Sequence, residues 1–100
     1  MFVVTGYFTI NPDLRAEAEA AIATCVAATL AEDGCIDYRY SADLIDPQRI
    51  NLSEQWETQE AMDVHMTQPH MAEFMNAFGP CLGGPMEVIT HEVSSSTKFL

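Results

Sequence analysis

The chain has 100 residues, of which 48% are hydrophobic and 19% are charged, and this indicates one folded globular domain. Fifteen acidic residues against four basic ones give a formal net charge of -11. Binding to a polyanion requires clustered lysines and arginines, and the four basic residues are scattered along the chain. Nucleic acids and anionic membranes are therefore not expected partners.

The cysteines and the N-terminal segment predict a cytoplasmic protein with reduced thiols. Cys25, Cys35 and Cys81 are an odd number and have no CxxC spacing, which favours small buried side chains. A disulfide or a reactive thiolate is the less favoured alternative. No apolar segment follows a basic one near the start, and no window of about 18 apolar residues could span a bilayer.

The first third of the chain predicts a strand followed by a helix. Phe2–Ile10 is uncharged and rich in β-branched and aromatic residues, which is typical of a strand covered on both faces. Asn11 and Pro12 then form a helix start, and Gly34 suits the left-handed position that ends a helix. The apolar stripe of this helix comprises Leu14, Ala18, Ala21, Ile22, Cys25 and Val26, continued by Thr29 and Leu30.

The middle of the chain predicts a β-hairpin and a short helix. Cys35–Ala42 alternates, with Ile36, Tyr38 and Tyr40 on one side. A turn follows, and the residues from Ile50 to Trp56 alternate again as the partner strand. Thr58 is a suitable N-cap for a helix that runs to about Met66.

The last third predicts a second helix, a final strand and a tail. Pro69 restarts helical structure, glycines and prolines then interrupt it, and Met86–Val93 reads as a strand. We expect a domain over residues 1–93 and an irregular tail over 94–100. The apolar stripe of the second helix comprises Met71, Phe74, Met75, Phe78 and Leu82.

The predicted element order is β-α-β-β-α-β. This order is typical of the ferredoxin-like α+β fold, in which helices cover one face of an antiparallel sheet. The uncovered face would carry apolar side chains of the first strand, whichever set faces outward. A second copy packed sheet to sheet would cover them, so we expect a homodimer.

One strand face and the helix after it hold the residues best suited to chemistry. Glu54 and Trp56 share a face of their strand, and His65 follows nine residues later. A neutral imidazole there could take a proton from a phenol, or simply bond to a backbone carbonyl. A carboxylate such as Glu54 on an apolar strand face is costly to bury unless it is paired, and a salt bridge with Arg39 or Arg49 is the alternative to a functional role. Trp56 could stack on a flat substrate or fill the core.

Cofactor and metal motifs are not expected. The chain has no Gly-rich phosphate loop and no nucleophile signature, and its three histidines do not form a helical HxxxH pair. A metal site is the less favoured alternative for the histidines and acids. Methionine and phenylalanine side chains could form either a core or a soft wall around a small aromatic ligand, namely Met62, Met66, Met71, Met75, Phe74 and Phe78.

Several short motifs occur in the order found in a known family, across residues 2–93. The chain resembles the antibiotic biosynthesis monooxygenase domain, and in particular its quinol-monooxygenase-like members. The segment with the glutamate, tryptophan and histidine is the most specific part of the likeness. The matching landmarks are Glu32-x-Gly34-Cys35-x-x-Tyr38, Asp46-Pro47, Glu54-x-Trp56, Glu60-Ala61, His65 and Pro69-His70.

The resemblance implies a dimeric α+β barrel in which two ferredoxin-like subunits join their sheets. It also implies a cofactor-independent monooxygenase that oxidises a quinol-like or phenolic aromatic with molecular oxygen. In such a site His65 would accept the phenol proton, Glu54 would orient the substrate and Trp56 would form a wall. The remaining substrate-binding residues would be Tyr38, Met71, Phe74 and Phe78.

Two departures from the family pattern bear on function. Met71 stands where the family often has phenylalanine, a mild change in a pocket wall. The heme-degrading relatives use an asparagine on the first strand, and Phe2–Ile10 contains none, which disfavours heme degradation. Two alternatives remain open: a non-catalytic small-ligand-binding or regulatory barrel, and a polyketide cyclase-like activity that consumes no oxygen.

Overall fold

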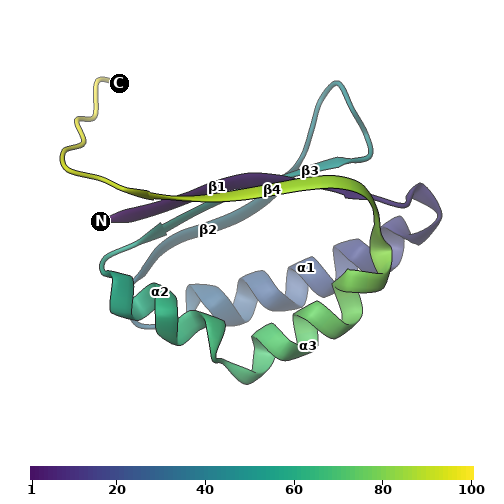
Figure 1. The fold of residues 1–100 in the computed structure, drawn as a ribbon, viewed down its shortest axis with the longest axis horizontal. Coiled ribbons are helices and arrows are strands. Elements are labelled where there is room, and N and C mark those ends of the chain that lie inside the picture. The colour runs from purple at the N-terminus through teal and green to yellow at the C-terminus, as the bar shows by residue number, and fades with distance from the viewer.

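Alternating strands and amphipathic helices form a two-layer α+β structure over all 100 residues of the computed structural model (Figure 1). Two single-turn 3₁₀ helices, Pro12–Leu14 and Gly79–Cys81, precede α1 and β4. The main elements are β1 (Phe2–Ile10), α1 (Arg15–Leu30), β2 (Cys35–Ala42), β3 (Arg49–Trp56), α2 (Gln59–Met66), α3 (Pro69–Phe78) and β4 (Leu82–Glu92).

The four strands form one antiparallel sheet in the order β2-β3-β1-β4. All three helices lie on the same face of this sheet, and the opposite face is bare (Figure 1). The predicted ferredoxin-like fold is therefore confirmed. None of the helices is both long and apolar enough to cross a bilayer.

Local sequence signals set several element ends as predicted. The Asn11 side chain accepts a hydrogen bond from the Asp13 amide, and the Thr58 hydroxyl accepts one from the Ala61 amide. Gly34 has a φ of +82°, so it occupies the left-handed region that favours glycine. A Cβ at Gly34 would also lie 2.5 Å from the Cβ of Ala61. The absence of a side chain thus lets this turn approach α2 closely.

Three sequence predictions need correction. A β-bulge interrupts the pairing between Cys35 and Asp37, so Ile36 leaves the inward alternation and is 47% exposed. Leu30 lies at the end of α1 and is exposed, although Thr29 beside it is buried as expected. Met75 on α3 is 54% exposed, because it borders the open cavity described below and is not packed in the core.

The last strand begins earlier than predicted. β4 starts at Leu82 rather than Met86, and it pairs with β1 despite the two glycines and the proline near its start. A register shift between Phe8 and Ile10 on β1 accommodates this irregular segment. The shift lets β4 cover the edge of β1 along nearly its whole length.

The core lies between the sheet and the helices, where the inward faces of the strands meet α1 and α3. Alanines on α1 allow the helix to approach the sheet closely, as Ala18 is fully buried. The buried core consists of Val4, Ile10, Ala18, Cys25, Tyr38, Ile50, Leu52, Trp56, Met71, Phe74, Phe78 and Cys81.

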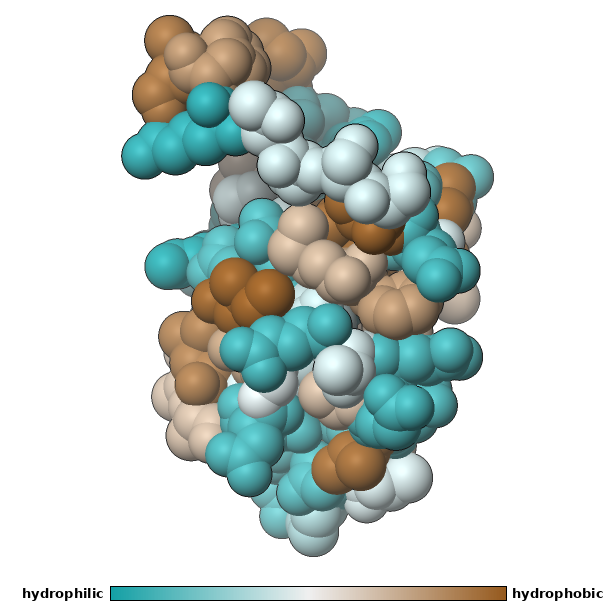
Figure 2. Space-filling view, turned by 90° about the vertical axis from the view of Figure 1, so that its left-hand side faces the viewer, coloured by the Kyte–Doolittle hydropathy of each residue, from teal (hydrophilic) through white to brown (hydrophobic).

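The outer face of the sheet and the tail leave apolar side chains in solvent. Ile89 of β4, which pairs with Thr5 on β1, is 43% exposed on this outer face. Phe99 and Leu100 at the end of the tail are 88% and 92% exposed. Figure 2 shows hydrophobic atoms gathered at the top of the view, beyond the sheet, on the side where the tail leaves the body.

Candidate active site

A cavity of about 430 Å³ lies between the sheet and the two short helices. Its volume falls within the range of about 300–1,000 Å³ that is typical of small-ligand sites. Two carboxylates, one imidazole and two tyrosine side chains interrupt its largely apolar wall. The lining residues are Phe8, Tyr38, Tyr40, Leu52, Glu54, His65, Met66, Met71, Phe74, Met75, Phe78, Gly79, Leu82, Met86, Glu87 and Val88.

The structure brings six of the seven candidate residues to this cavity. Trp56 is the exception, because it is fully buried and does not line the cavity. It lies behind the wall, with its ring centroid 4.8 Å from that of His65. Trp56 therefore packs against His65 and Glu54 from behind and does not face the cavity. The six that line the cavity are Tyr38, Glu54, His65, Met71, Phe74 and Phe78.

Glu54 is held by its neighbour on the same strand face. Alternation along β3 points both side chains toward the helices, and Trp56 Nε1 donates a hydrogen bond to Glu54 Oε1 at 2.8 Å. Glu54 is 7% exposed, and neither Arg39 nor Arg49 pairs with it, so the salt-bridge alternative is not what the structure contains. Burial raises the pKa of the Glu54 carboxyl, and the bond from Trp56 partly opposes this rise.

His65 is buried at the inner face of α2. Its ring packs against the rings of both Trp56 and Tyr38, and the Tyr38 ring centroid is 5.3 Å away. Its Nδ1 is 2.7 Å from Glu32 Oε2, so its partner is a carboxylate rather than a backbone carbonyl. This short contact fixes both the orientation and the tautomer of the imidazole, because an ionised carboxylate only accepts hydrogen bonds.

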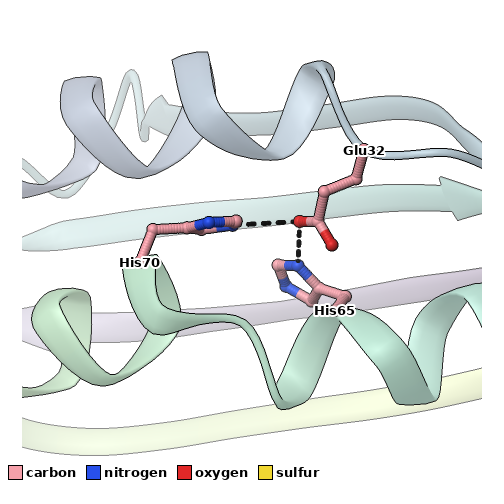
Figure 3. Close-up of side chains that lie close together, drawn as sticks. All are labelled: Glu32, His65 and His70. Carbon is pink, nitrogen blue, oxygen red and sulfur yellow. Dashed lines mark hydrogen bonds and ion pairs between the residues drawn. The ribbon is translucent and has the colours of Figure 1, made fainter.

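Glu32 and His70 complete a polar cluster that the sequence motifs did not reveal. Glu32 follows α1, His65 lies on α2 and His70 lies in the first turn of α3, and their side chains converge (Figure 3). His70 Nε2 is 3.0 Å from the same Glu32 oxygen. His65 lies 33 positions after Glu32 in the sequence, so no local spacing signals their contact. Glu32 and His70 both occur among the family landmarks, and these landmarks were the only feature of the sequence that indicated them.

The tautomer of His65 leaves its second nitrogen for chemistry. With the proton on Nδ1, Nε2 carries a free lone pair and can accept a proton. Nε2 has no hydrogen-bond partner in the protein, and it is not fully enclosed, because Glu32 Oε1 is the only enclosed side-chain oxygen or nitrogen without a partner. Since His65 lines the cavity, a hydroxyl group bound there would find a base with a carboxylate behind it.

Two tyrosines form a second polar edge of the cavity. The Tyr38 hydroxyl lies 3.4 Å from that of Tyr40 and 3.7 Å from Cys25 Sγ. Burial raises the pKa of Tyr38 and of Tyr40 above the usual value for a phenol. Both hydroxyls therefore stay protonated at neutral pH, and they can orient a ligand without acting as bases.

The cysteines are all free, as the sequence predicts. The surroundings of Cys25 and Cys35 make these two poor nucleophiles. Burial, reinforced by the charge of Glu32, raises the pKa of Cys35 from 9.0 to about 11. At pH 8 the thiolate fraction is thus about 100-fold lower than for a thiol with a pKa of 9.0. Burial also raises the pKa of Cys25.

We therefore expect iodoacetamide to alkylate the native protein very slowly at pH 8, and faster as the pH rises toward 11. Mass spectrometry at timed intervals measures this, and protein unfolded in urea, which should react at all three cysteines, is the control. Rapid native alkylation of Cys35 at pH 8 would contradict the expected environment.

The sequence matches the model of one protein family. The family model described as "Antibiotic biosynthesis monooxygenase" matches residues 1–77. The chain belongs to this family. Membership supports a monooxygenase-like function in general terms, and the matched region includes the whole polar cluster and most of the cavity wall.

Individual relatives agree with the family assignment. A protein of Mycobacterium tuberculosis that is provisionally named a monooxygenase is 29% identical over 85% of this chain and 83% of its own length. An uncharacterised protein of Synechocystis is 27% identical over 94% of this chain, and the match spans 64% of that longer relative.

Solved structures share the fold. The crystallised Mycobacterium tuberculosis protein superposes with a TM-score of 0.87 at 26% identity, over 97% of this chain and 98% of that one. A Deinococcus radiodurans protein, provisionally named after the same family, gives a TM-score of 0.90 over 100% and 99% of the two chains. Its identity is 22%, so this second likeness concerns the fold alone.

Proposed function

We propose that the protein is a cofactor-independent monooxygenase that oxidises a quinol-like or phenolic aromatic with molecular oxygen. The observation that carries the proposal is the imidazole of His65. It faces an apolar cavity with its free Nε2 and is held from behind by the Glu32 carboxylate at 2.7 Å. Family membership supports the same class of reaction.

The size and lining of the cavity support an aromatic substrate. A cavity of 150 Å³ lined by aliphatic and aromatic side chains is known to hold benzene, and this one is roughly three times larger. Phe74 and Phe78 stack at 4.8 Å and offer flat apolar surfaces, while Met71 adds an adaptable one. A substrate with one to three fused rings fits this volume and these walls.

His65 would activate the substrate by taking a proton. Nε2 removes the proton from a phenolic hydroxyl, and the resulting imidazolium is stabilised by the hydrogen bond from Nδ1 to Glu32. Glu54 presents its second carboxyl oxygen to the cavity, where it can bind another hydroxyl of the substrate. The apolar walls exclude water from the electron-rich phenolate, which then reduces oxygen.

The reaction balances without a cofactor because the substrate supplies all four electrons. For a simple hydroquinone, one molecule and one O₂ give one hydroxyquinone and one water. One oxygen atom enters the ring as the new hydroxyl oxygen, and the other leaves as water. The phenolic proton held on His65 returns to the reduced oxygen.

The bare sheet face supports a homodimer in the same proposal. Ile89 of β4 is 43% exposed on this face, and on the same face Arg49 of β3 stacks on the ring of Tyr7 of β1 at 4.0 Å. A second copy packed against this face would bury these side chains and complete a barrel. Sedimentation equilibrium should give twice the mass of the chain. A monomeric mass at micromolar concentration would rule the dimer out.

Oxygen consumption tests the proposed activity. Purified protein is incubated with a panel of mono-, bi- and tricyclic hydroquinones, and oxygen uptake is followed with an electrode against the spontaneous rate. Enzyme-dependent uptake with at least one compound is expected. Tight binding of such a compound with no uptake would instead support the ligand-binding alternative, and turnover without oxygen would support the cyclase-like one.

A further inference from the structure

Glu32, His65 and His70, whose side chains meet beside the cavity, carry atoms of the kinds that bind metal ions. Glu32 Oε2 lies 2.7 Å from His65 Nδ1 and 3.0 Å from His70 Nε2 (Figure 3). The ligand atoms of the three residues all lie within 4.8 Å of one another. Their side chains are 2%, 18% and 11% exposed for His65, His70 and Glu32, so this is an enclosed group rather than a surface cluster.

We propose that this cluster binds a divalent transition-metal ion, with Zn²⁺ the best match, through His65 Nδ1, His70 Nε2 and the Glu32 carboxylate. Two imidazoles and one carboxylate are a common ligand set for zinc, with bonds of about 2.0–2.2 Å. Tetrahedral ligands at that bond length are about 3.3 Å apart. The two Glu32–histidine separations of 2.7 and 3.0 Å are slightly shorter than this, and all ligand atoms lie within 4.8 Å of one another, so side-chain shifts would bring the three groups around one ion.

An unsatisfied oxygen points to the same ligand. Glu32 Oε1 is the one enclosed side-chain oxygen or nitrogen in the protein that has no hydrogen-bond partner. Buried acceptors are nearly always satisfied, so this atom calls for a partner such as a cation. A metal ion held against the carboxylate would use this oxygen or its neighbour and would neutralise the charge.

A second cavity gives the ion a route to the cluster. It measures about 380 Å³ and is lined by Glu32 and His70, which do not line the first cavity. Asp33 and Gln68 contribute to its polar wall, and the net charge of the chain attracts cations toward it. It also has room for the water that would complete a tetrahedral site.

Metal binding and the proposed base would exclude each other. A metal on Nδ1 uses the lone pair there, so the remaining proton of His65 must sit on Nε2. Nε2 would then face the cavity as a donor and could not take a phenolic proton. Zn²⁺ would act as a reversible inhibitor, a consequence that rests on the proposed function, whereas the metal site itself does not.

Metal binding is tested directly on the full chain, with any histidine tag removed and metal stripped by a chelator. Calorimetric titration with Zn²⁺ should give one site per chain with a micromolar or lower Kd. Co²⁺ should give the intense visible absorption of tetrahedral coordination. His70→Ala should weaken binding at least about 100-fold, because even outer-shell partners of a ligand are worth 10- to 100-fold.

Two further variants make the binding result decisive. His91→Ala removes a histidine outside the cluster, which bonds to Thr5 on the sheet, and should leave Kd unchanged. Glu32→Gln keeps the shape of the side chain and should also weaken binding, and circular dichroism checks that each variant is folded. No stoichiometric Zn²⁺ binding, or equal Kd values for wild type and both cluster variants, would overturn the proposal.

Inhibition is measured separately from binding. Zn²⁺ should suppress oxygen uptake by the wild type, and a chelator should restore it. The same concentration should have little effect on His70→Ala relative to its own metal-free rate. If no hydroquinone is oxidised, the proposed function fails while the binding titration still decides the metal site. If Zn²⁺ binds and oxygen uptake continues, the claim that metal binding prevents His65 from accepting the phenolic proton is wrong.

Discussion

Replacement of His65 by asparagine is expected to lower kcat/KM for the best hydroquinone by about 10²- to 10⁴-fold. Asparagine places its amide nitrogen close to the position of Nδ1, so it can still donate to Glu32, which lies 2.7 Å from that atom in the wild type. It has nothing at the position of Nε2. The variant therefore removes the base and keeps the hydrogen bond, and steady-state oxygen uptake measures the difference.

A matched histidine shows whether the loss is specific. His91→Asn makes the same chemical change on the sheet, outside the cavity, and should retain the wild-type rate within about twofold. Glu32→Gln should fall between the two, because the imidazole stays but loses its carboxylate. A His65→Asn variant that is folded and as active as the wild type would remove His65 from the mechanism.

Replacement of Trp56 by alanine is expected to cost about 3–5 kcal/mol of unfolding free energy. The side chain is fully buried and contacts both polar groups of the site, so its removal leaves a cavity and withdraws the donor from Glu54. Urea denaturation at one fixed protein concentration measures the change. Unfolding is followed by circular dichroism, because the variant lacks the only tryptophan and tryptophan fluorescence cannot be used.

Replacement of Trp56 by phenylalanine separates packing from hydrogen bonding. Phenylalanine retains most of the apolar contact but has no N–H, so Glu54 loses its partner at an expected cost of about 1–3 kcal/mol. The bond from Trp56 lowers the pKa of Glu54, so its loss should raise that pKa further. Equal stabilities of Trp56→Ala and the wild type would contradict the supporting role assigned here.

Local signals in the sequence were enough to predict most of the fold. The N-caps at Asn11 and Thr58 and the left-handed Gly34 mark element ends through interactions within a few residues. Alternation along β3 correctly places Glu54 and Trp56 on the inner face. Such features depend on backbone geometry and nearest neighbours, which a short stretch of sequence contains.

The features that depend on distant contacts could not be predicted from spacing. The bulge that turns Ile36 outward depends on the pairing of β2 with β3. The exposure of Met75 depends on how α3 lies on the sheet. The contact between Glu32 and His65 joins the end of α1 to α2 and needs the complete tertiary fold. Sequence spacing identified His65, but not the carboxylate that orients it.

Oxidation of the best hydroquinone under ¹⁸O₂ tests the central claim most directly. A monooxygenase that uses the electrons of its substrate should place one ¹⁸O atom in each molecule of hydroxyquinone and the other in water, with one O₂ consumed per product. Mass spectrometry of the product, quenched before exchange with solvent, measures this. A product without ¹⁸O, formed with one hydrogen peroxide per turnover, would show simple two-electron oxidation and would contradict the proposed monooxygenation.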